Sequence, residues 1–179
     1  IEYSFIRSLS GRYKPFWDIT RDGLDFAAAR LGLALDGAQR TQLMNQYACL
    51  SPFPENLAVL RRLKDAGLPT AILSNGTPAM LEAVVRQAGL SAAFSAILSV
   101  DALRIYKPSP RVYRHAAERL GLPPERLGFV SANGWDISGA QACGLQTFWI
   151  NRRHVPPERL GAAPDHTLAS LEELAGLLA

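Results

Sequence analysis

The chain has few residues that could bind a metal ion or form a disulfide framework. Its cysteines, Cys49 and Cys143, each stand alone, without a CxxC pair. Its histidines, His115, His154 and His166, form no HxH or HExxH pattern, which indicates surface or capping roles rather than metal ligation. Solitary cysteines in apolar surroundings are typical of small buried side chains in a reducing compartment. We therefore expect no disulfides, no metal site and a cytoplasmic protein.

Charge of one sign and long apolar runs are lacking too. The 19 lysines and arginines stand against 16 aspartates and glutamates, which leaves a net charge of +3. The densest basic group, Arg152-Arg153-His154, is too short for the basic stripe of a nucleic-acid-binding protein. No apolar run approaches the roughly 20 residues that a membrane span needs. We therefore expect neither nucleic acid nor membrane among the partners.

What remains is the pattern of an α/β protein. The chain has 179 residues, 48% of them hydrophobic, and is long enough for a real core. Residues 1–51 show helical spacing with little strand character, and we assign them to a helical cap. Pro52-Phe-Pro54 marks the boundary, because proline blocks the continuation of a helix. Residues 52–179 alternate short apolar strands with helices, which predicts an α/β core with a parallel sheet.

Polar loops follow the predicted strands of this core. Strands are expected over residues 69–73, 96–100, 127–130 and 147–150, the last being the final strand of the chain. Because ligands bind at the carboxyl ends of parallel strands, the loops after the first three are expected to form one rim. The candidate side chains on these loops are Ser74, Asn75, Lys107, Ser131, Asn133, Trp135 and Asp136.

Five segments carry a resemblance to a known family. They are Gly11-Arg-Tyr-Lys-Pro-Phe-Trp-Asp-Ile-Thr20, Leu73-Ser-Asn-Gly76, Tyr106-Lys-Pro-Ser-Pro-Arg-Val-Tyr113, Val130-Ser-Ala-Asn-Gly-Trp-Asp136 and Trp149-Ile-Asn-Arg152. In this order they resemble the type II L-2-haloacid dehalogenases of the haloacid dehalogenase superfamily. The resemblance covers essentially the whole chain, and the Ser-x-Asn-x-Trp-Asp loop is its most specific part. It implies a Rossmann-like parallel sheet with a helical cap.

The resemblance implies a hydrolase that needs no cofactor. Its substrates would be short L-2-haloalkanoic acids and its products D-2-hydroxy acids, formed through an aspartyl ester. The partner is thus a small molecule, and a homodimer is left open. Two alternatives remain. One is a phosphatase of the same superfamily, and the other is a non-catalytic fragment or binding module.

The substrate-binding candidates are Ser74, Asn75, Trp135 and Phe16. Ser74 and Asn75 precede a helix N-terminus, where free backbone N–H groups make an anion site. By resemblance this loop binds the substrate carboxylate, and Asn75 helps to hold the leaving halide. The structural alternative is a side-chain turn that caps the helix. Trp135 and Phe16 are expected to wall an apolar pocket, with cap packing as the alternative for Phe16.

The catalytic candidates are Lys107, Asp136, Asn133, Ser131 and Tyr113. A cation such as Lys107 keeps nearby carboxylates ionised, which suits an attacking aspartate; the alternative is a surface lysine in a turn. Asp136 and Asn133 are expected to position water, with Asp136 acting as a base or as partner to Lys107, or only as a helix N-terminal carboxylate. Ser131 could hydrogen-bond the nucleophile or the lysine. Tyr113 reaches the site by resemblance, or is simply a core residue.

The family's first strand, which ends in Asp-x-Tyr-Gly-Thr and carries the nucleophile, has no counterpart here. Only Asp101 caps an apolar run, and its family counterpart is a scaffold residue. By resemblance about 40 to 45 residues, one strand plus cap helices, would precede Ile1. We therefore expect a fragment that lacks the central strand and is inactive and poorly stable as given.

Metal-dependent phosphatases of this superfamily carry an acidic residue at the start of the last loop. Here Ser131-Ala132 stands at that place. A divalent cation such as Mg²⁺ wants oxygen ligands, and the alanine side chain has none. The sequence therefore favours metal-independent carbon–halogen chemistry over phosphoryl transfer.

Overall fold

The computed structural model describes residues 1–179 and divides the chain into two units. The first unit comprises Ile1–Pro52 and Ile72–Tyr106, and the second comprises Phe53–Ala71 and Lys107–Ala179. Each unit is thus built from two separate stretches of sequence. No helix of the chain combines the length and apolarity that crossing a membrane requires.

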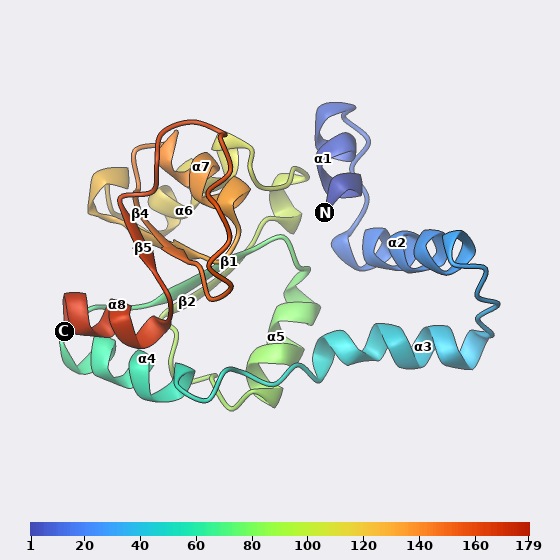
Figure 1. Ribbon diagram of the computed structural model, residues 1–179, viewed down its shortest axis with the longest axis horizontal. Helices are drawn as coiled ribbons and strands as arrows, with labels where there is room; N and C mark the ends of the chain where they lie inside the picture. The colour runs from blue at the N-terminus through green and yellow to red at the C-terminus, as the bar shows by residue number, and fades with distance from the viewer. The chain divides into compact units, whose positions relative to one another are not determined.

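The first unit begins with helices. These are α1 (Glu2–Leu9), α2 (Phe16–Arg30), α3 (Gly37–Asn45) and the short 3-10 helix η1 (Gln46–Ala48), with α2 and α3 side by side (Figure 1). Gly32 lies just beyond α2 with φ of +68°, the left-handed conformation expected where a helix stops. Asp36 caps α3, since its carboxylate accepts from the Gln39 amide at 2.8 Å and its own amide donates to Gln39 Oε1 at 2.9 Å. The predicted helical block is confirmed, and its role as a cap stays a prediction.

The expectation that both cysteines are buried is wrong. Cys49 follows η1 and is exposed, and Cys143 is only half-buried. The physical reason for Cys49 is that the end of this helix buries little apolar surface: α3 buries only Met44, and Leu43, Tyr47 and Leu50 are exposed as well. The burial of these two cysteines could therefore not be predicted from their lack of sequence partners.

The first unit also contains a two-stranded sheet of β1 (Ala71–Ser74) and β2 (Ala96–Ser99). The helix α5 (Pro78–Gln87) connects them, and η2 (Asp101–Leu103) follows β2. Thr77 accepts from the Met80 amide at 3.4 Å and Pro78 occupies the first turn of α5, as the sequence predicts. At the strand ends, the Val100 amide donates to the Ser74 carbonyl at 3.0 Å.

The second unit contains a parallel sheet in the order β3-β4-β5. The strands are β3 (Gly128–Ser131), β4 (Gln146–Ile150) and β5 (His166–Leu168). The predicted α/β class with a parallel sheet is confirmed, but β4 is not the last strand as expected. β5 has only three residues and no apolar run, so periodicity does not reveal it. It is held by Asp165, whose Oδ2 accepts from both the amide and the hydroxyl of Thr147 at 2.7 Å.

Helices of the second unit pack around this sheet. They are α4 (Asn56–Asp65), α6 (Pro110–Leu120), η3 (Pro124–Arg126), α7 (Gly134–Gln141) and α8 (Leu171–Leu178), with α4 and α8 side by side (Figure 1). Val59 and Leu63 of α4 form a buried cluster with Ala175 of α8. Arg152, just after β4, pairs with Glu55 at 2.5 Å and stacks 3.9 Å from the Phe53 ring centroid. That contact fixes residues 53–55 to the end of the central strand.

Candidate active site

A buried ion pair forms near the N-termini of α6 and α7 in the second unit. Lys107 directly precedes the turn into α6, and Asp136 lies in the first turn of α7. Their side chains meet with Lys107 Nζ 2.7 Å from Asp136 Oδ2, and the two residues are only 8% and 3% exposed. The N-terminus of α7 adds a favourable partial positive charge beside the carboxylate. The sequence offered this partnership as one of two roles for Asp136 and placed both residues on the rim formed by the strand-end loops; in the structure the pair is buried.

Two hydroxyl groups complete the environment of the Asp136 carboxylate. Tyr113 donates to Asp136 Oδ1 at 2.7 Å, and Ser131 donates to Oδ2 at 3.2 Å. The Asn133 amide in turn donates to Ser131 Oγ at 3.2 Å, so the serine hydrogen is free to point at the carboxylate. Together with Lys107, three donors converge on this one carboxylate.

Tyr113 is the most deeply buried member of this group, with no exposed surface. Burial, together with the neighbouring Asp136 charge, raises the pKa of Tyr113 far above its usual value near 10. Tyr113 therefore remains protonated and acts as a hydrogen-bond donor. Tyr113 is a core residue whose hydroxyl also reaches Asp136, and its role in the reaction stays a prediction.

Phe129 forms an apolar wall against this cluster and was not predicted as a site residue. Lys107 Nζ lies 5.4 Å from the centroid of its ring, and the ring meets Tyr113 edge to face with centroids 5.5 Å apart. An ammonium over an aromatic face is attracted by the ring quadrupole. A signal was available, because Phe129 lies within the apolar strand that delivers Ser131.

The loop between β3 and α7 carries the remaining candidates of this unit. Asn133 is exposed at the N-cap of α7, and its side chain makes no capping bond. Trp135 is half-buried. The Ala132 carbonyl accepts from Trp149 Nε1 at 3.3 Å, so the one polar acceptor at this position already has a donor. Nowhere in residues 1–179 do three His, Cys, Asp or Glu side chains gather in a manner suited to a metal ion.

Ser74 and Asn75 belong to the first unit. Ser74 Oγ accepts from the Gly76 amide at 3.1 Å, which makes the side-chain turn that the sequence left open as the structural alternative. Asn75 is buried, 7% exposed, immediately before the N-terminus of α5. A buried amide at such a place remains compatible with anion binding, so the structural and functional readings do not exclude each other.

Phe16 also belongs to the first unit, where it packs in an aromatic cluster. Its ring lies 5.8 Å from that of Tyr106, which stacks on Tyr13 at 5.3 Å. Tyr106 is fully buried and its hydroxyl donates to the Lys14 carbonyl, while Tyr13 donates to the Asp101 carboxylate. Burial is the main cause that raises the pKa of Tyr106 to about 12. The ring partner of Phe16 is thus Tyr106, outside residues 1–51, so this contact is not the cap packing weighed as the alternative, and the role of Phe16 in substrate binding stays a prediction.

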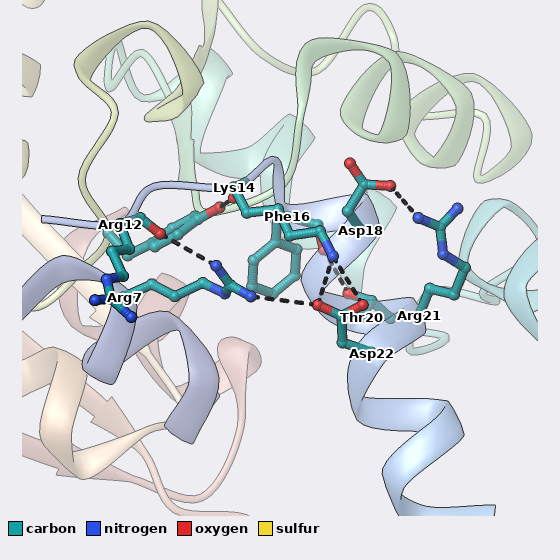
Figure 2. A network of polar contacts seen from close by, with 9 residues as sticks. Arg7, Arg12, Lys14, Phe16, Asp18, Thr20, Arg21 and Asp22 are labelled. Atoms are coloured by element: carbon teal, nitrogen blue, oxygen red, sulfur yellow. Dashed lines mark hydrogen bonds and ion pairs between the residues drawn. The ribbon is translucent and has the colours of Figure 1, made fainter. Parts of the chain in front are cut away.

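A charged network surrounds this aromatic cluster. Figure 2 shows Lys14 and Arg7 both reaching Asp22, with Lys14 Nζ at 2.6 Å and Arg7 Nη2 at 3.5 Å from Oδ2. Thr20 Oγ1 donates to the Phe16 carbonyl at 2.8 Å, which ties the first turns of α2 together. These bonds hold the segment around residues 11–20 that sequence reasoning singled out.

The structure thus brings Lys107, Asp136, Ser131 and Tyr113 together in one unit. A family model described as haloacid dehalogenase-like hydrolase matches residues 4–144. The chain belongs to this family. It is 45% identical over 178 residues to (S)-2-haloacid dehalogenase 1 of Pseudomonas sp. (strain CBS-3), a match that covers 99% of this chain and 78% of that protein.

Solved structures give the same family at the level of the fold. A crystal structure of an L-2-haloacid dehalogenase superposes with a TM-score of 0.97 at 49% identity, covering 99% of this chain and 80% of the other. An L-2-haloacid dehalogenase from Xanthobacter autotrophicus with chloropropionic acid covalently bound gives 0.90 at 36% identity, covering 98% and 80%. The predicted membership of the superfamily and the resemblance to L-2-haloacid dehalogenases are confirmed.

Proposed function

We propose that this haloacid dehalogenase-like hydrolase dehalogenates short L-2-haloalkanoic acids to D-2-hydroxy acids through an aspartyl ester. The observation that carries the proposal is the buried pair of Lys107 and Asp136, with Tyr113 and Ser131 as further donors. A buried cation such as Lys107 is the group that an attacking carboxylate needs beside it. The relatives named as 2-haloacid dehalogenases support the choice of substrate.

We place the nucleophile on an aspartate outside these 179 residues. Every aspartate that lies at the end of a strand or in its loop already holds a scaffold contact: Asp101 with Tyr13, Asp136 with Lys107 and Asp165 with Thr147. The others lie in or cap helices, namely Asp18, Asp22, Asp25, Asp36 and Asp65. None of these is a free carboxylate at the carboxyl end of a strand, as the attack requires.

The first step in this proposal is displacement of the halide. A carboxylate oxygen forms a bond to C2 from the side opposite the halogen while the carbon–halogen bond breaks and the halide leaves with the electron pair. Configuration at C2 inverts. Lys107 keeps the attacking carboxylate ionised, and the backbone amides and Asn75 near the start of α5 bind the substrate carboxylate and the departing halide. Trp135 and Phe16 form apolar surface around C2.

The second step is hydrolysis of the ester. Water bonds to the carboxyl carbon of the aspartyl ester, the bond from that carbon to the substrate oxygen breaks, and the hydroxy acid leaves. Asp136 and Asn133 position this water; Asp136 accepts its proton and returns it to the ester oxygen that leaves on the hydroxy acid, and the regenerated aspartic acid loses a proton to solvent. The donors Tyr113 and Ser131 fix the orientation of Asp136; with Lys107 also bonded to Oδ2, one lone pair remains for water on Oδ1.

The test uses the longest open reading frame that contains this chain. We expect chloride release from (S)-2-chloropropionate, none from the (R) isomer, and (R)-lactate as the product by chiral chromatography. A single turnover in H₂¹⁸O should label an aspartate of the protein, because water attacks the ester at the enzyme's carboxyl carbon. Racemic lactate would overturn the inverting displacement. Hydrolysis of p-nitrophenyl phosphate with Mg²⁺ in place of dehalogenation would overturn the proposal in favour of the phosphatase alternative.

A further inference from the structure

Gly139 lies within α7, one turn beyond Asp136, at a point where two neighbours approach the helix very closely. A Cβ atom built on Gly139 would lie 2.6 Å from the Tyr113 hydroxyl oxygen, 2.9 Å from Tyr113 Cε2 and 2.7 Å from Pro108 Cβ. Carbon atoms in good contact stay about 3.5–4.0 Å apart. Even alanine therefore does not fit at this position without a shift of Tyr113 or Pro108.

Local preference does not explain this glycine. Gly139 is not among the residues with positive φ, so the backbone conformation suits any residue. Within a helix, glycine is less favourable than alanine by about 1 kcal/mol. A glycine at a position where the helix itself would favour alanine indicates that neighbouring residues leave no room for a side chain there.

The two neighbours of Gly139 hold the ion pair from its two sides. Tyr113 donates to Asp136 Oδ1 at 2.7 Å. Pro108 directly follows Lys107, so its position sets where the lysine side chain begins. An atom at Gly139 that displaced either neighbour would change the distance and direction between Lys107 and Asp136.

We propose that Gly139 is a positioning residue, whose missing side chain allows Tyr113 and Pro108 to set the geometry of the Lys107–Asp136 pair. Gly139 touches no reacting atom in this account and acts through Tyr113 and Pro108. The expectation for catalysis rests on the proposed function, whereas the expectation for Tyr113 does not.

The experiment substitutes Gly139→Ala in the complete protein and reads two independent signals. The ¹³Cζ resonance of Tyr113, identified by its loss in Tyr113→Phe, reports the hydrogen bond to Asp136 and should shift. Turnover of 2-chloropropionate should fall at least about tenfold with KM nearly unchanged, because misplacement by an ångström or less is costly in a catalytic group. If the protein has no dehalogenase activity, the resonance alone still decides the proposal.

Gly176→Ala is the matched control. Gly176 also lies inside a helix, α8, and a Cβ there would meet nothing within 4 Å. It should leave the Tyr113 resonance and turnover unchanged, which separates the contact at Gly139 from the general effect of adding a methyl group to a helix.

The double variant Gly139→Ala/Tyr113→Phe separates positioning from packing. It lacks the hydroxyl oxygen that makes the closest contact but keeps Pro108 Cβ and the ring edge of residue 113, so adding Gly139→Ala to Tyr113→Phe should cost less turnover than adding it to the wild type. Equal losses in both backgrounds would overturn the proposal, and so would an unshifted Tyr113 resonance. If Gly139→Ala does not fold, the double variant should still fold; if it too fails, the contact serves packing alone and the proposal is wrong.

Discussion

Asp136 in the second unit and Asp101 in the first unit occupy similar local structures. Each lies in the first turn of a helical segment that follows a strand, and each accepts a hydrogen bond from a tyrosine hydroxyl, Tyr113 or Tyr13. The serine that ends each strand accepts an amide from two residues further on, at 3.2 Å in both cases. A serine at the end of a strand, followed by a short polar loop, therefore forms the same side-chain turn in both units.

The difference between the two places lies in charge and burial. Asp136 is 3% exposed and pairs with the buried Lys107. Asp101 is half-buried and forms no ion pair; the nearby Arg104 lies over the Tyr13 ring, 4.9 Å from its centroid. A hydrogen bond from a tyrosine to a carboxylate therefore does not by itself mark a reaction centre, because Asp101 has one too. The buried lysine is what distinguishes the candidate reaction centre.

Removing the ion pair should give the largest effect. Lys107→Met and Asp136→Asn should each lower turnover by at least about a hundredfold, as expected when a positioned acid–base or electrostatic group is lost. Asp101→Asn should change turnover by less than about threefold, because it removes no charge pair. Steady-state chloride release measures all three variants. A hundredfold loss in Asp101→Asn would erase the distinction between the two carboxylates.

Because the pair is buried, stability must be measured beside turnover. Removing one partner of a buried ion pair typically costs about 3–5 kcal/mol, since the other charge is left unpaired. The double variant Lys107→Met/Asp136→Asn leaves no unpaired charge and should regain thermal stability without regaining turnover. Mass spectrometry separates the roles: Asp136→Asn should accumulate an alkylated peptide, whereas Lys107→Met should not form it.

The two tyrosines sharpen the same comparison at a smaller scale. Tyr113→Phe should lower turnover about tenfold, because a hydrogen bond to a charged group contributes roughly 1.5–3 kcal/mol. Tyr13→Phe should leave turnover within about twofold and lower only the melting temperature, since its partner Asp101 is a scaffold residue. Parallel kinetics and calorimetry on the two variants test this. Equal losses of turnover would mean that the first-unit cluster also takes part in the reaction.

Much of this arrangement could be predicted from sequence because local rules decide it. Gly32, Thr77 and Pro78 mark helix ends as expected, and the polar loops do follow the strands. The pairing of Lys107 with Asp136 was one of two roles that the sequence left open. It could be suggested because a cation and a carboxylate on neighbouring loops have few better partners.

The features that sequence did not reveal depend on contacts between distant residues. β5 pairs with β4, and Asp165, just before β5, accepts from the backbone amide and the hydroxyl of Thr147 in β4. Gly139 matters through what packs against it and has no local signature, whereas Phe129 was overlooked although it lies in the apolar strand that delivers Ser131. The burial of the Lys107–Asp136 pair also depends on how the rest of the second unit packs around it, so the sequence alone did not predict it.

Asp165 is a third carboxylate for this comparison, and it forms no ion pair with a lysine or arginine. The Thr147 hydroxyl and amide, in that order, lower the pKa of Asp165 from its usual value of 3.8. A group whose pKa is lower in the folded state contributes stability above its unfolded pKa and loses it as pH falls through the folded value. Asp165→Asn should therefore lower the melting temperature at pH 7, and the difference from wild type should shrink below about pH 4. Turnover at pH 7 should stay unchanged, as Asp165 supports only β5; a difference that persists at pH 2 would contradict this reading.

Removing metal ions with a chelator should have the smallest effect of all, because the loop after β3 has few oxygen atoms available to bind a metal. Ala132 has no side-chain oxygen, and its carbonyl already accepts from Trp149 Nε1. Asp136, the only acidic residue of that loop, is occupied by Lys107, Tyr113 and Ser131, whereas Mg²⁺ requires several oxygen ligands in near-octahedral geometry. We expect halide release from 2-chloropropionate to continue at the same rate after exhaustive treatment with EDTA and removal of the chelate by gel filtration. Loss of activity that Mg²⁺ restores would mean that the Asp136 carboxylate leaves Lys107 for a metal, and it would return the reaction to the phosphoryl-transfer class.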